Sequence, residues 1–229
     1  MSLGVFWSLL NPLVMMGILT FVFGTVFKHS TPNFPLFVLC GLVPFNFFVV
    51  ATNMGTTSLL DNAGLVKRVP VPLNVVPIST VISACIHFGI QVALLLSFAL
   101  ISGFTVTRYW LWLPVIFGLE ILFVCGLVLI TSSITVYVRD TRYLVESANS
   151  VLFWLVPIFY PLDIIPQQFR NVYQYNPMAA VVLAVQHIIM QMKSPPETLL
   201  WKLPAVSLAV FVVGYLFFSR LKPRFFEHL

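Results

Sequence analysis

A single acidic residue, Glu120, lies deep within a long apolar stretch, where a carboxyl group could carry a proton or contact a polar substrate. His87 lies at a similar depth in the preceding apolar stretch, which must run in the opposite direction, so the two side chains could meet. Such a polar pair could act as a proton relay or a substrate contact, or it could be a bridge between two helices. One isolated pair favours the structural bridge.

Other catalytic or cofactor-binding patterns are missing from the sequence. It contains no G-x-x-x-x-G-K-[ST] motif, so this chain does not bind a nucleotide through a P-loop. The four histidines are scattered without metal-ligand spacing, and the three cysteines lie inside apolar runs, where they are typical of small core residues. We therefore predict no catalytic residue, no metal site and no cofactor in this chain.

The link at residues 61–74 mixes charged side chains with aliphatic ones, and it is too short to form a domain. It could form a short helix that ends before Pro70, because the residue before a proline disfavours helix. An amphiphilic helix at a membrane face could dock a soluble partner, or it could be only a turn. The candidate docking residues are Asn62, Leu65, Lys67, Arg68 and Pro72.

The composition indicates the class of protein in which these residues lie. Of the 229 residues, 59% are hydrophobic and only 8% are charged, whereas an average soluble domain is roughly 25% charged. These values exclude an ordinary soluble globule, a disordered chain and a disulfide-rich secreted module. The net charge of +5 comes from small basic clusters between apolar runs, which is typical of membrane topology signals and not of nucleic-acid binding.

The apolar runs predict an all-α integral membrane protein with one transmembrane domain over residues 1–229. A helix needs about 20 residues to cross the hydrocarbon core. The sequence contains six runs of this kind, at about 11–27, 36–59, 75–101, 110–136, 143–160 and 195–219. Basic residues cluster on the side that would carry both termini, which places the termini in the cytoplasm of a multi-pass inner-membrane protein.

The segment at 163–192 does not fit a further crossing, because the helix expected at 177–192 has only 16 residues, and we predict two short re-entrant helices there. The first would start near Asp163 and Pro166. The second would have Asn176 as its N-cap and Pro177 in its first turn. Backbone that dips into a membrane without spanning it is tolerated where it packs on protein or lines a wet cavity, so these helices indicate a pathway or its cap. The alternative is an interfacial loop with no role in transport.

Six short segments carry a similarity to a known family. They are WSLLNPL (7–13), GLVPF (41–45), LVKRV (65–69), VYVRD (136–140), FWLVPIFY (153–160) and YNPM (175–178). With these segments in this order, the chain resembles the membrane subunit of ABC-2-type exporters, specifically the export permeases for polysaccharides such as O-antigen, capsule and teichoic acid. The similarity runs through almost the whole chain.

The resemblance implies a homodimer of six-span subunits in contact with membrane lipid. Each subunit would dock on a separately encoded ABC ATPase, which holds ATP and magnesium. The loop at 62–68 would couple the two proteins, and Arg139 and Asp140 would lie near the same interface. The substrate would be a polyprenyl-diphosphate-linked glycan that moves between the two protomers.

The resemblance also implies roles at the outer side and along the channel. The helices around residues 163–192 would be outer gate helices, with Asp163, Pro166, Tyr175, Asn176 and Pro177 as gate residues. The candidates for the channel wall are Phe48, Trp154 and Tyr160.

The start of the chain departs from the family pattern. Family members usually carry a basic amphipathic helix before the WSLLNPL segment, whereas this segment begins here at residue 7. We therefore expect either a start codon assigned too late or a truncated subunit. Three other functions stay open, namely an ABC-2 exporter of a drug or lipid, a proton-coupled carrier that uses Glu120 and His87, and an intramembrane enzyme.

Overall fold

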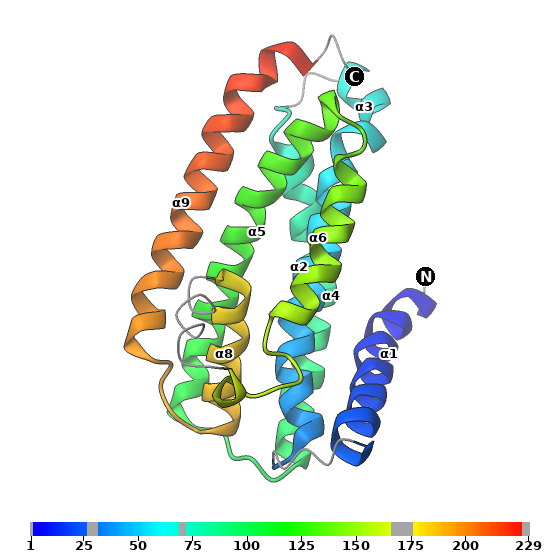
Figure 1. Cartoon of the computed structure of the whole chain (residues 1–229). Helices are drawn as coiled ribbons and strands as arrows, with labels where there is room; N and C mark the ends of the chain where they lie inside the picture. The colour runs from blue at the N-terminus through cyan, green and yellow to red at the C-terminus, as the bar shows by residue number, and fades with distance from the viewer. Residues whose placement is uncertain (1, 27–31, 69–71, 166–175, 226–229) are drawn as a thin grey trace.

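The computed structural model of the chain describes residues 2–26, 32–68, 72–165 and 176–225, and this part of the chain is helical with no strands (Figure 1). The helices are α1 (Ser2–Leu19), η1 (Thr20–Val26, a π-helix), α2 (Phe34–Asp61), α3 (Ala63–Arg68), α4 (Val75–Ile101), η2 (Arg108–Leu111), α5 (Trp112–Tyr137), α6 (Thr141–Leu155), η3 (Leu162–Ile164), α8 (Pro177–Met190), α9 (Glu197–Leu221) and η4 (Lys222–Arg224).

Four helical segments are long and apolar enough to cross a membrane, namely Phe34–Asp61, Val75–Ile101, Arg108–Tyr137 and Leu199–Arg224. The shortest of them has 26 residues, which is about 39 Å of helix against a hydrocarbon core of about 30 Å. These four segments coincide with four of the spans predicted from the sequence. The prediction for residues 75–101 agrees with α4 at both ends.

The first and fifth predicted spans differ from the structure. α1 begins at Ser2 and continues into η1, so the helix starts well before residue 11. α6 has 15 residues and ends at Leu155, and about 22 Å of helix is too short to cross the core alone. The predicted span at 143–160 is therefore wrong over its last five residues, 156–160, because the chain leaves the helix before Pro157.

α2 is the central helix of the bundle. It is apolar around most of its circumference, and it packs against α1, α4, α5, α6 and α8. A helix of this kind must be buried on all sides. Aromatic contacts fix two of its neighbours: Phe47 stacks on Phe88 of α4 with ring centroids 4.4 Å apart, and Phe48 stacks on Phe123 of α5 at 6.2 Å.

α5 and α9 approach each other at the level of the backbone. A Cβ atom added to Gly126 would lie 2.6 Å from the Phe211 Cα atom, and one added to Gly214 would collide with the backbone of Gly126. Small residues at helix contacts allow such close packing inside membranes. The two glycines therefore explain why these two helices can lie so close together.

The two ends of the bundle differ, and we refer to them as the α3 end and the α8 end. The α3 end carries α3 and the end of α9, and the α8 end carries α8 and the start of α9 (Figure 1). A small separate apolar cluster closes the α3 end. It consists of Leu59, Leu73, Leu129, Val136, Phe218 and Phe225. This cluster connects the ends of α2, α5 and α9 to the loop that follows α3.

Candidate functional site

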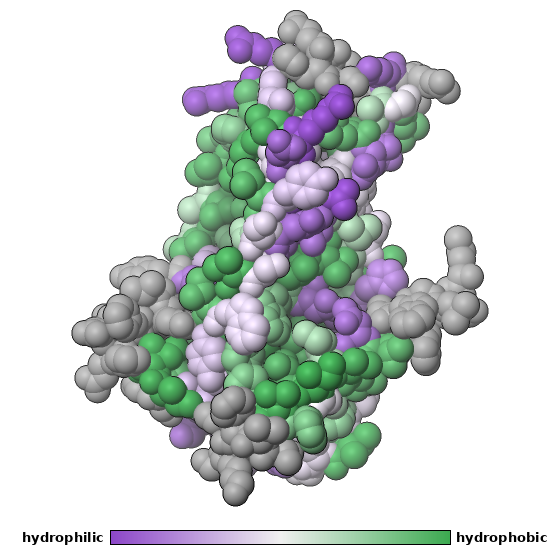
Figure 2. All heavy atoms as spheres, turned by 45° about the vertical axis from the view of Figure 1, so that its right-hand side comes forward, coloured by the Kyte–Doolittle hydropathy of each residue, from purple (hydrophilic) through white to green (hydrophobic). Residues whose placement is uncertain are grey.

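A polar strip runs along α6 on one face of the bundle. Figure 2 shows hydrophilic side chains gathered in this strip, with hydrophobic side chains on either side. α6 is mostly exposed, and only Thr141 and Asn149 among its residues are buried. Between α6 and α2 lies an open groove of about 420 Å³. It is lined by Phe45, Val49, Asn53, Glu146, Asn149, Ser150, Phe153 and Trp154.

Amide groups form the floor of the α2–α6 groove. The Asn149 Nδ2 group donates to Thr52 Oγ1 at 3.1 Å and to Asn53 Oδ1 at 2.9 Å. The Thr52 hydroxyl in turn donates to the Phe48 carbonyl at 2.7 Å. Polar side chains of this kind hold helices together in a membrane. Sequence reasoning missed Asn53 and Asn149, although single polar residues in apolar helices are a recognisable signal.

Aromatic side chains form the wall of the groove. The Trp154 side chain is 62% exposed. Phe153 contacts the Trp154 ring edge-to-face, and it lies 5.6 Å from the Phe45 ring. The Tyr160 hydroxyl donates to the carbonyls of Trp154 and Leu155, both at 3.0 Å, and so fixes the chain where α6 ends.

The three residues predicted from the sequence to line the channel lie in two different places. Trp154 and Tyr160 lie at the exposed end of α6, close to each other in space. Phe48 is only 2% exposed and packs in the core against Phe123. This placement corrects its assignment as a channel-lining residue, because α2 turns Phe48 toward α5 and away from the groove.

The expected pair of Glu120 and His87 does not form. Glu120 is fully buried, and neither of its carboxylate oxygens has a hydrogen-bond partner among the described residues. His87 is exposed and lines a different cavity of about 290 Å³, together with Asn11, Asn46 and Gln91. Both residues lie on the predicted helices, but the helix rotation, which the sequence does not specify, separates them.

The link after α2 forms the predicted short helix. The Asn62 Nδ2 group donates to the Ser58 carbonyl at 2.8 Å and closes α2. α3 follows and ends at Arg68, before Pro70, as predicted. Leu65 is 56% exposed, and Lys67 is exposed as well, so α3 carries an apolar and a basic side chain on its surface.

Further charged residues lie at the same end of the bundle. Arg139 and Asp140 are exposed in the short turn between α5 and α6. Arg142 and Glu146 form an ion pair at 2.9 Å on the first turns of α6. Pro72 is exposed, whereas Leu73 beside it is buried in the apolar cluster at the α3 end. The residues predicted for docking are thus brought to one end of the molecule.

At the opposite end, α8 has the predicted N-terminus. The Asn176 Oδ1 atom accepts a hydrogen bond from the Met178 backbone at 3.0 Å, with Pro177 as the first helical residue. Asp163 lies in η3, a three-residue 3-10 turn, and not at the start of a longer helix in the described part of the chain. The predicted gate residues Pro166 and Tyr175 lie outside the described residues.

Comparison with known proteins agrees with this architecture. The family model described as ABC-2 type transporter matches residues 1–190. The chain belongs to the ABC-2 type transporter family. The ABC-2 membrane proteins are transport subunits, so the lack of a catalytic centre predicted from the sequence agrees with membership of this family.

Relatives within the ABC-2 family match almost the whole chain. An O-antigen export system permease protein RfbA of Klebsiella pneumoniae is 30% identical over 227 residues, which is 99% of this chain and 87% of that protein. RfbA of Myxococcus xanthus is 27% identical and covers 99% of this chain and 88% of its own length. The polysialic acid transport protein KpsM of Escherichia coli is 26% identical over 82% of this chain and 74% of its own length.

Proposed function

We propose that this chain is the membrane-spanning subunit of an ABC exporter that moves a polyprenyl-diphosphate-linked polysaccharide across the cytoplasmic membrane. The names of the relatives support the polysaccharide class. The observation that carries the proposal is the groove between α2 and α6, where amides and aromatic rings lie together between hydrophobic side chains. A polar surface of this kind is expensive against lipid, which indicates that it faces water or substrate.

The groove has the chemistry that an uncharged glycan needs. Amide groups such as those of Asn53 and Asn149 can exchange hydrogen bonds with sugar hydroxyls. Exposed aromatic faces such as that of Trp154 cover the C–H surface of a sugar ring. Neither contact depends on the order of the sugars, so a long chain can slide along the wall.

A single groove is only one side of a channel, and a second copy of the chain supplies the other side in this proposal. In this arrangement, α1 with η1 and α6 with the loop after it complete six crossings together with the four long helices. α8 is then a re-entrant gate helix on the outer side. The homodimer hides the polar strip from lipid, which a lone subunit in a bilayer does not achieve.

The α3 end is the cytoplasmic end in this proposal, and it docks on a separate ABC ATPase that binds ATP and magnesium. Basic residues gather there, including Lys67, Arg139 and Arg142, as the positive-inside rule requires. Both termini are then cytoplasmic. A push on α3 reaches α5 and α9 through Leu73, which is buried against the ends of both helices.

Export of surface glycan tests the proposal. Cells that lack this permease are complemented with the wild-type chain, with Trp154→Ala, or with Trp201→Ala, and the glycan on the cell surface is measured. Trp201 is a matched control, because it is 82% exposed on α9, away from the groove. We expect Trp154→Ala to lower the surface glycan several-fold at equal membrane levels, and Trp201→Ala to leave it unchanged.

Two results contradict the proposal. If the wild-type chain restores no surface glycan while it co-purifies with an ATPase, the cargo is another one, such as a drug or a lipid. If no ATPase co-purifies with the folded protein and a pH gradient drives transport, the carrier alternative is correct. The separation of Glu120 from His87 argues against that second result.

A further inference from the structure

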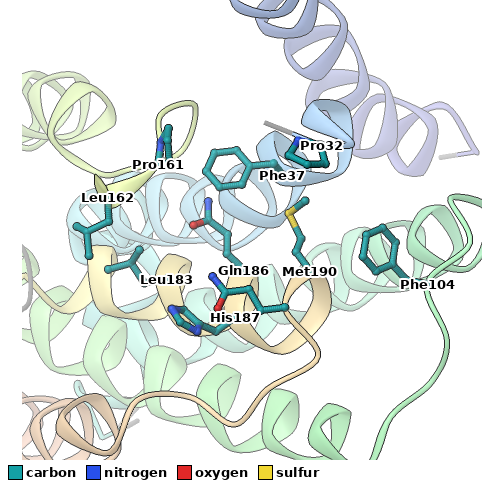
Figure 3. Close-up of a pocket in the computed structure, with 10 residues that line it drawn as sticks. Pro32, Phe37, Phe104, Pro161, Leu162, Leu183, Gln186, His187 and Met190 are labelled. Carbon is teal, nitrogen blue, oxygen red and sulfur yellow. The ribbon is translucent and has the colours of Figure 1, made fainter. Parts of the chain in front are cut away.

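A second cavity lies at the α8 end and shares no lining residue with the α2–α6 groove. Figure 3 shows its walls, which come from α8, from the first turns of α2 and from the loops after α4 and α6. Its volume is about 470 Å³, which is within the usual range for small-molecule sites of roughly 300–1,000 Å³. The function proposed above does not use this cavity.

The lining combines aromatic and neutral polar groups. Phe37 from α2 and Phe104 from the loop after α4 supply rings, while Gln186, His187 and Gln191 supply hydrogen-bonding groups. Among the described residues that line the cavity, none has a side chain that is permanently charged. Small-molecule sites typically show this combination of apolar walls and a few well-placed polar groups.

The polar groups are held in position for a ligand. The Gln186 Nε2 group donates to the Pro157 carbonyl at 3.1 Å, which orients the amide while its Oε1 atom can accept a further hydrogen bond. Burial lowers the pKa of His187, and the positive charge of Lys193 adds to this effect. Both effects favour the neutral imidazole, which has one donor and one acceptor nitrogen.

This chemistry selects among ligand classes. A charged ligand would lose its hydration without gaining an opposite charge from the lining. A wholly apolar ligand, such as an acyl chain, would offer no hydrogen bond to the Gln186 Oε1 atom or to the His187 ring nitrogens. A neutral sugar satisfies both sets of groups, because its hydroxyls match the amides and the imidazole while its C–H face lies on Phe37 or Phe104.

We propose that this cavity binds an uncharged sugar unit of the exported glycan at the outer side of the subunit. The identity of the glycan and the outer location rest on the proposed function, but the preference for a neutral sugar rests on the cavity alone. A unit held there would keep a partly exported chain from sliding back between two transport strokes.

Saturation-transfer NMR on the purified permease–ATPase complex in nanodiscs tests this assignment. The probes are oligosaccharides released by mild acid from the surface of the source cells, and free glucose, galactose, mannose and N-acetylglucosamine. We expect saturation transfer to at least one neutral probe. Phe104→Ala and Gln191→Ala should each weaken binding roughly fivefold, which corresponds to the loss of one ring contact or one hydrogen bond.

Leu111→Ala is the matched control, since Leu111 is 78% exposed near the same end and does not line the cavity. Binding should be unchanged in this variant. The assignment is overturned if no neutral probe binds, if both cavity variants bind like the control, or if glucuronic acid binds better than glucose. A phospholipid that co-purifies with the wild type and is lost in both cavity variants would overturn it as well.

Failure of the cavity assignment in this NMR test can be distinguished from failure of the proposed export function. Surface glycan restored by the wild type, together with no binding of any neutral probe, removes the cavity assignment and leaves the export function. Binding that depends on Phe104 and Gln191, without any export of glycan, removes the export function and leaves a sugar site.

Discussion

At the scale of the residue, the Asn149 side chain joins α6 to α2 by two hydrogen bonds. Asn149→Ala removes the donor to both Thr52 and Asn53, and we expect a loss of about 1–2 kcal/mol in stability. The measurement is the thermal midpoint of the purified protein in detergent. Ser150→Ala is the control, because its exposed hydroxyl bonds only within α6; equal midpoints for both variants would contradict the role of Asn149.

Substitution of Glu120 is expected to raise stability, whereas Asn149→Ala is expected to lower it. The Glu120 carboxyl group is fully buried and without a hydrogen-bond partner in the described part of the chain. Burial of an unpaired polar group costs stability, so Glu120→Met, which has a similar shape and no such group, should raise the thermal midpoint. Glycan export should persist in this variant. Loss of export with a normally folded protein would show that Glu120 acts in transport.

At the scale of the element, the contact between α5 and α9 depends on the absence of a side chain at Gly126. Gly126→Ala places a methyl group against the Phe211 backbone, which cannot yield as a side chain can. We expect a destabilisation of about 1–3 kcal/mol and a lower yield of folded protein. Gly118→Ala on the same helix is the control, since a Cβ there meets nothing within 4 Å. Alanine favours a helix over glycine at such an open site, so Gly118→Ala should keep or raise stability, and an equal loss in both variants would contradict the packing explanation for Gly126.

The comparison of elements shows how far the sequence can predict this fold. α4 is predicted to the residue because its apolar run is bounded by a proline-rich link at one end and by Ser102 and Gly103 at the other. The N-terminus of α8 is predicted because Asn176 and Pro177 form a local cap. The end of α6 is not predicted, because the apolar aromatic run that continues to Tyr160 predicts one span, although Pro157 disfavours helix at the residue before it.

The candidate site was less predictable than the helices. Trp154 could be selected because it belongs to an aromatic run in a recognisable segment. Phe48 belongs to a similar run, but it faces the core, because a helix of mixed aromatic residues does not reveal its rotation. Asn53 and Asn149 are 96 residues apart and meet only in the folded bundle.

At the scale of the whole molecule, the α3 end should couple this chain to its ATPase. We expect Lys67→Glu, alone or with Arg139→Ala, to abolish co-purification of the ATPase, because it reverses the charge of an exposed side chain on α3. The fold should be intact, with an unchanged thermal midpoint. Lys193→Glu at the α8 end serves as the control for a charge reversal on an exposed lysine. Equal recovery of the ATPase with all variants would exclude α3 as its docking site.

The length of α6 has a consequence for the bilayer around the protein. A helix of 15 residues beside neighbours of 26 to 28 residues creates a hydrophobic mismatch on one side of the subunit only. Lipid next to α6 must thin to meet it, at a cost of a fraction of a kcal/mol per Å. That cost grows with acyl-chain length, and it disappears in the proposed homodimer, where a second copy covers the helix. Thicker membranes should therefore favour association of the subunits through this face. In this way the bilayer itself would help to hold the two sides of the proposed channel together.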